Sequence, residues 1–293
     1  MSSESGDTSP DSPRLTLQKV MTLITHIEDD FDLNKIAGSG QCFRWEKIND
    51  NTFRIPHRGS CLRISDLGGG DYEADCTEEE FSGIWSNYFD LAENYRKIRS
   101  MIDPEEDPFL FRAAEQEKGI RILRQDPWEM LISFIISQNK NIPAIRNSVF
   151  LLAEACGEPE KDKMGRPFYA FPTAEAVAAL GEEDLKKCRL GYRCRYVHEA
   201  AKAVASGKID LGRLAAAGEK SALAELTALY GVGVKVASCV QLFGLHDMDS
   251  FPRDVWINRV LENEYPKGYP FEKYSPYNGV FQQYMFAYYR DKK

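Results

Sequence analysis

A lysine and an aspartate in the C-terminal third of the chain could carry out covalent chemistry. Lys235 follows the turn Gly231-Val232-Gly233, and Asp254 comes after the next apolar run. The helix dipole disfavours an ammonium in the first turn of a helix, and burial disfavours it further. Lys235 is therefore a candidate nucleophile, and Asp254 a candidate for stabilising positive charge. Each residue taken alone also fits a plainer interpretation, as a solvated lysine and as a helix cap.

The apolar spacing around these residues predicts a helix, a tight turn and a second helix. Apolar side chains recur at helical spacing from 223 to 230 and again from 236 to 243. Glycine adopts the left-handed conformation of such a turn without steric cost. The amides near Gly231 and Gly233 then sit at the positive end of the second helix, which is a favourable place for a phosphate.

Charge is unevenly distributed along the 293 residues. The net charge of −8 and the pI near 5.2 argue against a protein that coats nucleic acid. Between residues 186 and 208, however, seven lysines and arginines are opposed only by Glu199, whereas acidic residues gather at 78–80 and 103–107. A local basic face on an acidic protein suits an enzyme that samples DNA, with strongly salt-dependent binding.

Cysteine usage and hydropathy indicate an intracellular protein. The seven cysteines are irregularly spaced, which favours a reducing compartment over a disulfide framework. We find no apolar run long enough for a bilayer and no signal-peptide pattern at the N-terminus. We therefore expect no membrane association.

Three segments can be distinguished along the chain. Residues 1–14 are rich in Ser, Pro and Asp and predict a disordered tail. Residues 15–108 predict an antiparallel α+β domain, with strand signals from about Asp32 to Cys76 and turns at 49–51 and 68–70. Thr77 and Glu80 form a capping box for a helix on that sheet, and another helix is expected from 95 to 101.

Residues 109–293 predict an all-α domain. Asp126, followed by proline and an acidic first turn, starts a helix to Ser137 that is apolar enough to be buried. Asn141 starts the next helix, which ends at Gly157. A polar loop is expected from there to Pro172, followed by short helices.

Five segments together resemble the 8-oxoguanine DNA glycosylases of the helix-hairpin-helix superfamily. They are SGQCFRW (39–45), QNKNI (138–142), LGYRCRYV (190–197), the hairpin with Lys235 and Asp254, and NGVFQQYMF (278–286). The resemblance implies an antiparallel α+β domain followed by a two-lobed helical glycosylase domain with the cleft between the lobes. It also implies a bifunctional enzyme that excises 8-oxoguanine from duplex DNA and then cleaves the strand by beta-elimination through a lysine Schiff base.

The resemblance also implies DNA-contacting residues, because a glycosylase must flip its target base and fill the gap. Tyr192 would be the wedge, Asn139 the plug, and Arg193 would face the orphaned base, while Gly231 and Gly233 of the hairpin would contact the backbone. A core aromatic for Tyr192 and a phosphate contact for Arg193 are the plainer interpretations.

The same resemblance implies a base pocket. Cys239 and Phe286 would stack on the flipped base, and Gln282 would hydrogen-bond its Watson–Crick edge. The carbonyl of Gly40 would accept the N7 hydrogen that 8-oxoguanine has and guanine lacks. A small buried hydrophobe for Cys239 and an ordinary core residue for Phe286 are the alternatives.

Two positions depart from the family pattern. Eukaryotic members carry an arginine that helps to select cytosine opposite the lesion, and Ala144 stands at the matching position. Trp256 stands where they have histidine, which would alter a phosphate contact. The first departure favours a bacterial-type member with relaxed opposite-base choice.

The resemblance implies no metal or organic cofactor. Some relatives hold an iron–sulfur cluster with four C-terminal cysteines, but this chain has no cysteine after Cys239. Whether the hairpin carbonyls bind a monovalent or divalent cation is left open. The expected partner is duplex DNA containing 8-oxoguanine, bound by a monomer located in the bacterial cytoplasm (nucleoid) or a eukaryotic nucleus.

Two other functions are compatible with parts of the pattern. One is a glycosylase for another oxidised base, although such relatives usually carry the missing cluster and lack SGQCFRW. The other is a non-catalytic helix-hairpin-helix DNA-binding module, which explains the hairpin but gives no reason for Lys235, Asp254 and Cys239 to coincide.

Overall fold

The N-terminal part is a five-stranded antiparallel sheet with the strand order β1-β5-β4-β3-β2. The computed structural model describes residues 21–216 and 219–290, so the predicted tail at residues 1–14 lies outside the described residues. The strands are β1 (Leu23–His26), β2 (Glu46–Lys47), β3 (Thr52–His57), β4 (Ser60–Gly68) and β5 (Asp71–Ala74). The turns predicted at 49–51 and 68–70 are confirmed, since they join β2 to β3 and β4 to β5.

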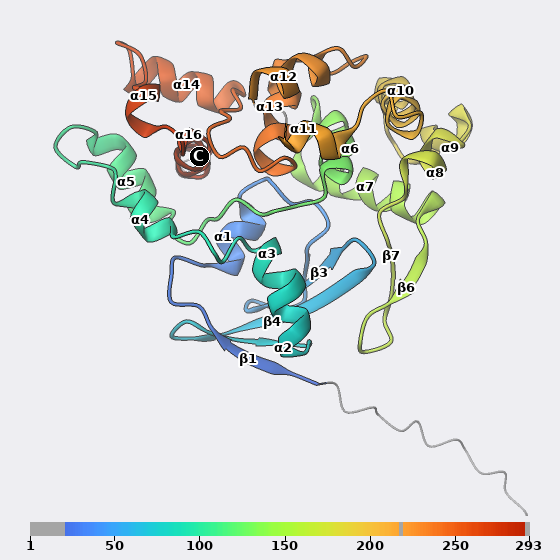
Figure 1. The fold of residues 1–293 in the computed structure, drawn as a ribbon, viewed down its shortest axis with the longest axis horizontal. Coiled ribbons are helices and arrows are strands. Elements are labelled where there is room, and N and C mark those ends of the chain that lie inside the picture. The colour runs from blue at the N-terminus through green and yellow to red at the C-terminus, as the bar shows by residue number, and fades with distance from the viewer. Residues whose placement is uncertain (1–20, 217–218, 291–293) are drawn as a thin grey trace, which may run out of the picture.

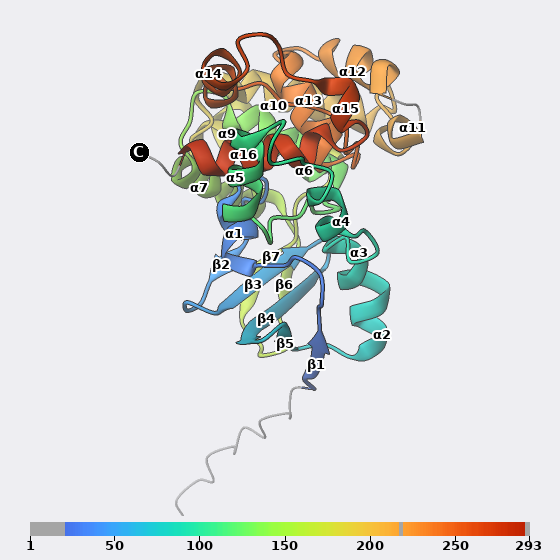
Figure 2. The same cartoon turned by 90° about the vertical axis from the view of Figure 1, so that its left-hand side faces the viewer.

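One segment of the predicted strand region is helical instead. Helix α1 (Leu33–Gly38) begins at Asp32, whose carboxylate accepts a hydrogen bond from the Lys35 amide at 3.0 Å. Its buried face includes Leu33 and Ile36, at helical rather than strand spacing. The strand prediction was therefore wrong for these residues, and β1, which precedes them, is an edge strand of the sheet. In both views α1 lies between the sheet and the helices (Figures 1 and 2).

A short helical layer packs against the sheet, as predicted from the capping box. It consists of α2 (Glu78–Glu80), a π-helical turn η1 (Phe81–Trp85) and α3 (Ser86–Tyr88). The Thr77 side chain and the Glu80 side chain each accept the other's backbone amide, at 3.2 and 2.9 Å, so the capping box is confirmed. Trp85 and Phe81 bury their rings in the core of the sheet.

The remaining chain is mostly helical and surrounds a second core (Figure 1). Its helices are α4 (Tyr95–Arg99), α5 (Pro108–Gln116), α6 (Pro127–Ser137), α7 (Ile142–Cys156), α8 (Ala174–Ala178), α9 (Glu182–Lys187), a 3-10 turn η2 (Gly191–Arg193), α10 (Cys194–Ala205), α11 (Leu211–Ala216), α12 (Glu219–Thr227), α13 (Val234–Phe243), α14 (Val255–Glu264), α15 (Phe271–Tyr274) and α16 (Asn278–Arg290). The predicted helix starts at Asp126 and Asn141 are confirmed, and α6 is buried. Within the described residues, no helix combines the length and apolar character needed to cross a bilayer.

The region predicted as a polar loop up to Pro172 contains a β-hairpin, formed by β6 (Pro159–Lys161) and β7 (Pro167–Tyr169). Neither strand shows an apolar alternation, so the pairing depends on contacts that the sequence does not reveal. The buried Arg54 of β3 donates to the Asp162 carboxylate at 2.7 Å and to the carbonyls of Arg166 and Pro167. These bonds fasten the hairpin to β3 of the sheet.

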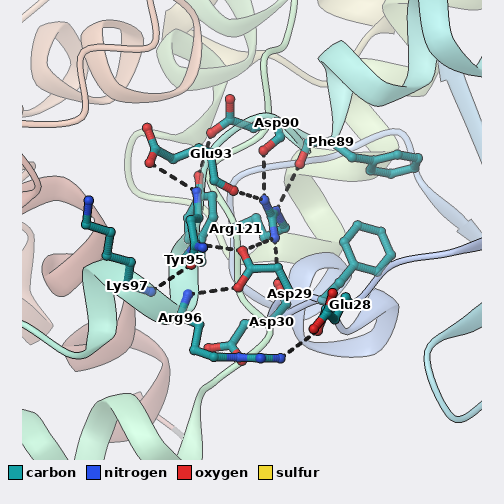
Figure 3. Close-up of polar contacts among 12 residues, drawn as sticks. Glu28, Asp29, Asp30, Phe89, Asp90, Glu93, Tyr95, Arg96, Lys97 and Arg121 are labelled. Atoms are coloured by element: carbon teal, nitrogen blue, oxygen red, sulfur yellow. Dashed lines mark hydrogen bonds and ion pairs between the residues drawn. The ribbon is translucent and has the colours of Figure 1, made fainter.

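Arg121 joins the segments that connect the sheet to the helices (Figure 3). Its fully buried guanidinium donates to one carboxylate and four backbone carbonyls and lies 4.2 Å from the ring centre of Tyr95. The acceptors are Asp29 at 3.0 Å and the carbonyls of Asp30, Phe89, Asp90 and Glu93 at 2.7–3.1 Å. Burial works to raise the pKa of Asp29, but amide hydrogen bonds from Arg96 and Tyr95 hold it below its usual value.

We expect Arg121→Leu to lower the free energy of unfolding by about 3–5 kcal/mol, because it removes one partner of a buried charged pair and orphans four carbonyls. Urea unfolding followed by circular dichroism measures the change. Arg112→Leu, at an exposed position of α5, is the control and should stay within about 0.5 kcal/mol of the parent. Equal stability of the two variants would contradict this account of Arg121.

Candidate active site

The predicted helix-turn-helix is present and places Lys235 in the first turn of α13. Gly231 has φ +80°, and a Cβ built there would lie 2.3 Å from the ring of Tyr196. Only glycine fits this position, both for its backbone conformation and for the ring packed against it. Gly233 caps α13 with an extended backbone and has open space around it.

The Lys235 side chain lies between an aromatic ring and a thiol. Its Nζ is 5.4 Å from the ring centre of Phe134 on α6, and its side chain hydrogen-bonds to that of Cys239 one helical turn further on. Burial raises the pKa of the Cys239 thiol, although Lys235 works in the opposite direction. Cys239 is therefore a neutral, buried thiol beside the amine.

Asp254 caps α14, as its sequence context predicted. One carboxylate oxygen accepts a hydrogen bond from the amide of Ile257 at 2.8 Å, which fixes the side chain at the start of the helix. The capping interpretation is thus correct. It does not compete with a chemical role, because the same carboxylate also lines a cavity with Lys235.

A cavity of about 60 Å³ brings the predicted pocket residues together. Its lining includes both candidate catalytic residues and all four candidate base-binding residues: Lys235, Asp254, Gly40, Cys239, Gln282 and Phe286. This volume is far smaller than the one a purine base occupies. Larger hollows, of about 580 and 560 Å³, lie elsewhere and contain neither Lys235 nor Asp254.

Gly40 brings the N-terminal domain to the wall of this cavity. It has φ +81°, and a Cβ there would lie 3.3 Å from the Phe286 ring. The neighbouring Gln41 is fully buried, and its side chain donates to the carbonyl of Arg121 at 2.8 Å and accepts the amide of Leu123 at 2.9 Å. The loop with Gly40 is thereby pinned to the segment that carries Arg121.

The opposite wall comes from α16. Gln282 is buried, its amide nitrogen donates to the carbonyl of Pro252 at 3.0 Å, and its oxygen accepts from Gln283 at 2.9 Å. The ring of Phe286, one turn further on, is half-buried at the cavity. The assignment of oxygen and nitrogen in these amides follows from the hydrogen-bond network.

The predicted DNA-contacting residues gather at a second place. Tyr192 is 54% exposed, so it is not a core aromatic, and its hydroxyl accepts a hydrogen bond from Asn139 at 3.1 Å. Asn139 is exposed and has a left-handed backbone with φ +51°. Arg193 is buried instead: it lies 4.3 Å from the Tyr192 ring centre and donates to the carbonyls of Gln138 and Leu190.

Gln138, whose side chain was not among the predicted site residues, connects this group to the hairpin. Its amide nitrogen donates to the carbonyl of Gly231 at 3.1 Å, and its own carbonyl accepts from Arg193 at 2.7 Å. Phe134, beneath Lys235, was also missed, because an aromatic residue within the apolar run of α6 gives no signal that separates it from core. The position of Gln138 inside QNKNI was the available signal for its role.

Part of the predicted basic face is neutralised by local ion pairs. Lys186 pairs with Glu182 and Glu183, and Lys187 pairs with Asp184, all within α9. The sequence window began at Lys186 and so omitted these acids. Hydrogen bonds to Glu183 and Glu182 raise the pKa of Lys186. On α10 Lys202 is paired with Glu199 in the same way, whereas Arg195 is exposed and its guanidinium lies 4.5 Å from the Tyr230 ring centre.

All seven cysteines are free thiols. Among the residues described, no group of three or more His, Cys, Asp or Glu side chains is arranged to hold a metal ion.

The sheet, the helical domain and a lysine at the hairpin beside an aspartate define a helix-hairpin-helix DNA glycosylase fold. Residues 23–131 match the family model described as "8-oxoguanine DNA glycosylase, N-terminal domain", and residues 132–266 match "HhH-GPD superfamily base excision DNA repair protein". The chain belongs to the 8-oxoguanine DNA glycosylase family of that superfamily.

Curated relatives and solved structures cover most of the chain. It is 33% identical to N-glycosylase/DNA lyase OGG1 of Arabidopsis thaliana, over 82% of this chain and 67% of that protein. It is 35% identical to N-glycosylase/DNA lyase of Saccharomyces cerevisiae, over 80% of this chain and 68% of that protein. The structure of Clostridium acetobutylicum 8-oxoguanine glycosylase/lyase, in complex with DNA containing cytosine opposite 8-oxoG, superposes with a TM-score of 0.84 at 31% identity, covering 92% of this chain and 98% of that one.

The two hairpin glycines give a matched pair of variants. We expect Gly231→Ala to cost about 1–2 kcal/mol for the left-handed backbone alone, with a further cost for displacing Tyr196. Gly233→Ala should cost less than about 1 kcal/mol, because only the cap preference changes. Thermal unfolding of both proteins measures the difference, and an equal loss in the two would refute the asymmetry.

Proposed function

We propose that the chain is a bifunctional DNA glycosylase/AP lyase that excises 8-oxoguanine from duplex DNA. The observation that carries the proposal is the convergence of Lys235 and Asp254 on one cavity, in a chain that belongs to the 8-oxoguanine DNA glycosylase family. Gly40, Cys239, Gln282 and Phe286 line the same cavity. A non-catalytic DNA-binding module would give this convergence no purpose.

In the proposed mechanism Lys235 is the nucleophile. Its unprotonated Nζ attacks C1′ of the flipped nucleotide, and the C1′–N9 bond breaks with its electron pair on the base. The proton that the amine loses balances the one that the base takes up. Opening of the sugar ring then transfers a second proton to O4′ and leaves an imine between Nζ and C1′.

Strand cleavage follows from the imine. The imine acidifies C2′, which loses a proton, and the C3′–O bond breaks with the phosphate as leaving group. Water then hydrolyses the imine and regenerates the amine. An arginine cannot replace Lys235 in this sequence, because a guanidinium neither loses its proton nor forms the imine.

Asp254 has an electrostatic role in this proposal. Positive charge builds up on the sugar as the base departs, and a carboxylate held by the Ile257 amide faces it without having to reorganise. Acceptance of a proton from Lys235 is a second use of the same group. The neutral thiol of Cys239 does not compete for either role.

Base selection rests on the two walls of the cavity. Cys239 and Phe286 would sandwich the flipped base, and Gln282 would bond its Watson–Crick edge. The carbonyl of Gly40 would accept the N7 hydrogen of 8-oxoguanine, whereas guanine would present a lone pair to that buried acceptor. Because the cavity of about 60 Å³ is smaller than a purine, the half-buried Phe286 must move when the base enters.

The second group of residues would hold the opened duplex. Tyr192 is exposed as a wedge requires, and Asn139, bonded to its hydroxyl, would fill the vacated space. To contact the orphaned base, Arg193 would have to give up one of its hydrogen bonds to a backbone carbonyl. Gly231 and Gly233 would place the backbone amides of the hairpin against a phosphate. We propose that the enzyme acts as a monomer wherever genomic DNA lies, in a nucleoid or a nucleus.

We expect borohydride to trap a covalent adduct between the protein and an 8-oxoguanine duplex, because the imine is reducible. Lys235→Gln should abolish trapping and strand cleavage, which gel electrophoresis measures. Lys97→Gln, at an exposed lysine of α4 outside the basic face, is the matched control and should trap normally. A folded Lys235→Gln protein that cleaves at the parent rate would remove Lys235 from the mechanism.

We also expect relaxed choice of the base opposite the lesion. Ala144, half-buried in the first turn of α7, offers no group that can hydrogen-bond a cytosine. Single-turnover excision should therefore differ little between cytosine and adenine opposite 8-oxoguanine. Ala144→Arg should widen the difference by about 1–3 kcal/mol, the value of one good base contact. Strict cytosine preference in the parent protein would show that another residue reads this base.

A further inference from the structure

Two arginines of the helical domain hold the backbone that leads to Gly40. Arg146, on α7, donates from Nη2 to the carbonyl of Ala37 at 3.0 Å. Arg290, in the last turn of α16, donates from Nη1 to the carbonyl of Gly38 at 2.8 Å. Both bonds cross from the helical domain to the end of α1, two and three residues before Gly40.

Arg290 also contacts the other wall of the cavity. Its guanidinium carbon lies 5.3 Å from the ring centre of Phe286, one helical turn before it on α16. The same ring is 3.3 Å from the position of a Cβ at Gly40. One side chain thus connects the loop that carries Gly40 with the ring that stacks on the base.

The two arginine bonds complete a set of contacts around the loop. On its other side, Gln41 fixes the loop to the Arg121 segment through buried hydrogen bonds. Those bonds hold the loop against the segment that connects α5 to α6. Among the hydrogen bonds described for residues 37–41, those from Arg146 on α7 and Arg290 on α16 are the ones that come from helices of the helical domain, and α16 also carries Gln282 and Phe286. Charged donors make such bonds stronger than neutral ones.

We infer that Arg290, supported by Arg146, is a positioning residue for base recognition. It fixes the backbone before Gly40 relative to the ring of Phe286, so that the Gly40 carbonyl faces the base when the pocket opens. This inference rests on the proposed function. It adds a specificity role for two side chains that lie outside the reacting atoms.

The contacts predict a selective loss of activity. Arg290→Leu keeps an aliphatic stem at a half-exposed position but removes the donor and the charge. A displacement near 1 Å at a reacting group can cost about 100-fold, so we expect base excision to slow by about 10- to 100-fold. Cleavage of a duplex that already contains an abasic site needs no base recognition and should stay at the parent rate.

Single-turnover rates on the two duplexes test this prediction, together with the melting temperature of each variant. Arg290→Lys retains one donor and should recover part of the excision rate. Arg146→Leu should give the same selective loss in weaker form. Arg112→Leu removes an exposed arginine of α5 with the same change in net charge and should alter neither rate.

Hydrogen exchange of the unliganded protein gives a readout that does not depend on catalysis. The amides of residues 38–41 should exchange faster in Arg290→Leu than in the parent or in Arg112→Leu. Equal loss on both duplexes, an unchanged excision rate or unchanged exchange of the loop would each overturn the inference. If the parent excised no 8-oxoguanine, the proposed function would fail, whereas the exchange result would still decide whether Arg290 holds the loop.

Discussion

The cavity lined by Lys235 and Asp254 is built by Gly40 from the N-terminal part of the chain and by side chains of the later helices, so the relative placement of these two parts is the constraint on which the site depends. Arg121 is the interaction that meets this constraint most directly. A fully buried guanidinium is costly to desolvate, and the Asp29 carboxylate with four carbonyls offsets that cost by occupying its donors. Its backbone carbonyl binds Gln41 next to Gly40. The residue that joins the connecting segments therefore also anchors the loop that carries Gly40.

Features that depend on residues close together in the chain could be predicted from the sequence. The glycine turn, the Asp254 cap and the capping box at Thr77 each depend on residues a few positions apart, and the structure has all three. Helix α1 was missed although its signal is local, because the strand patterns on its C-terminal side were extended back over Asp32. The hairpin of β6 and β7 was missed for a different reason: its main anchor, Arg54, lies more than 100 residues away.

The site residues show the same difference between contacts that are near in the sequence and contacts that are distant. Lys235 and Cys239 could be placed together because they lie one turn apart on one helix. Phe134 could not be added, since its contact with Lys235 spans about 100 residues and its own surroundings resemble any buried helix. Arg146 and Arg290 carry no motif at all. Their contacts with Ala37 and Gly38 arise only once the two domains are docked.

The small size of the cavity relates the contacts of Arg290 to the entry of a base. The pocket of about 60 Å³ is smaller than a purine base, so in the proposed function it must widen, and the half-buried Phe286 beside Gly40 is the side chain we expect to move. Because Arg290 contacts both the ring and the backbone before Gly40, the ring cannot move far without changing a contact that also holds the loop. In the proposed function, admission of a base and placement of the Gly40 carbonyl would be parts of one rearrangement. An undamaged guanine would then have to open the same pocket and meet the same carbonyl without the N7 hydrogen that 8-oxoguanine would donate to it.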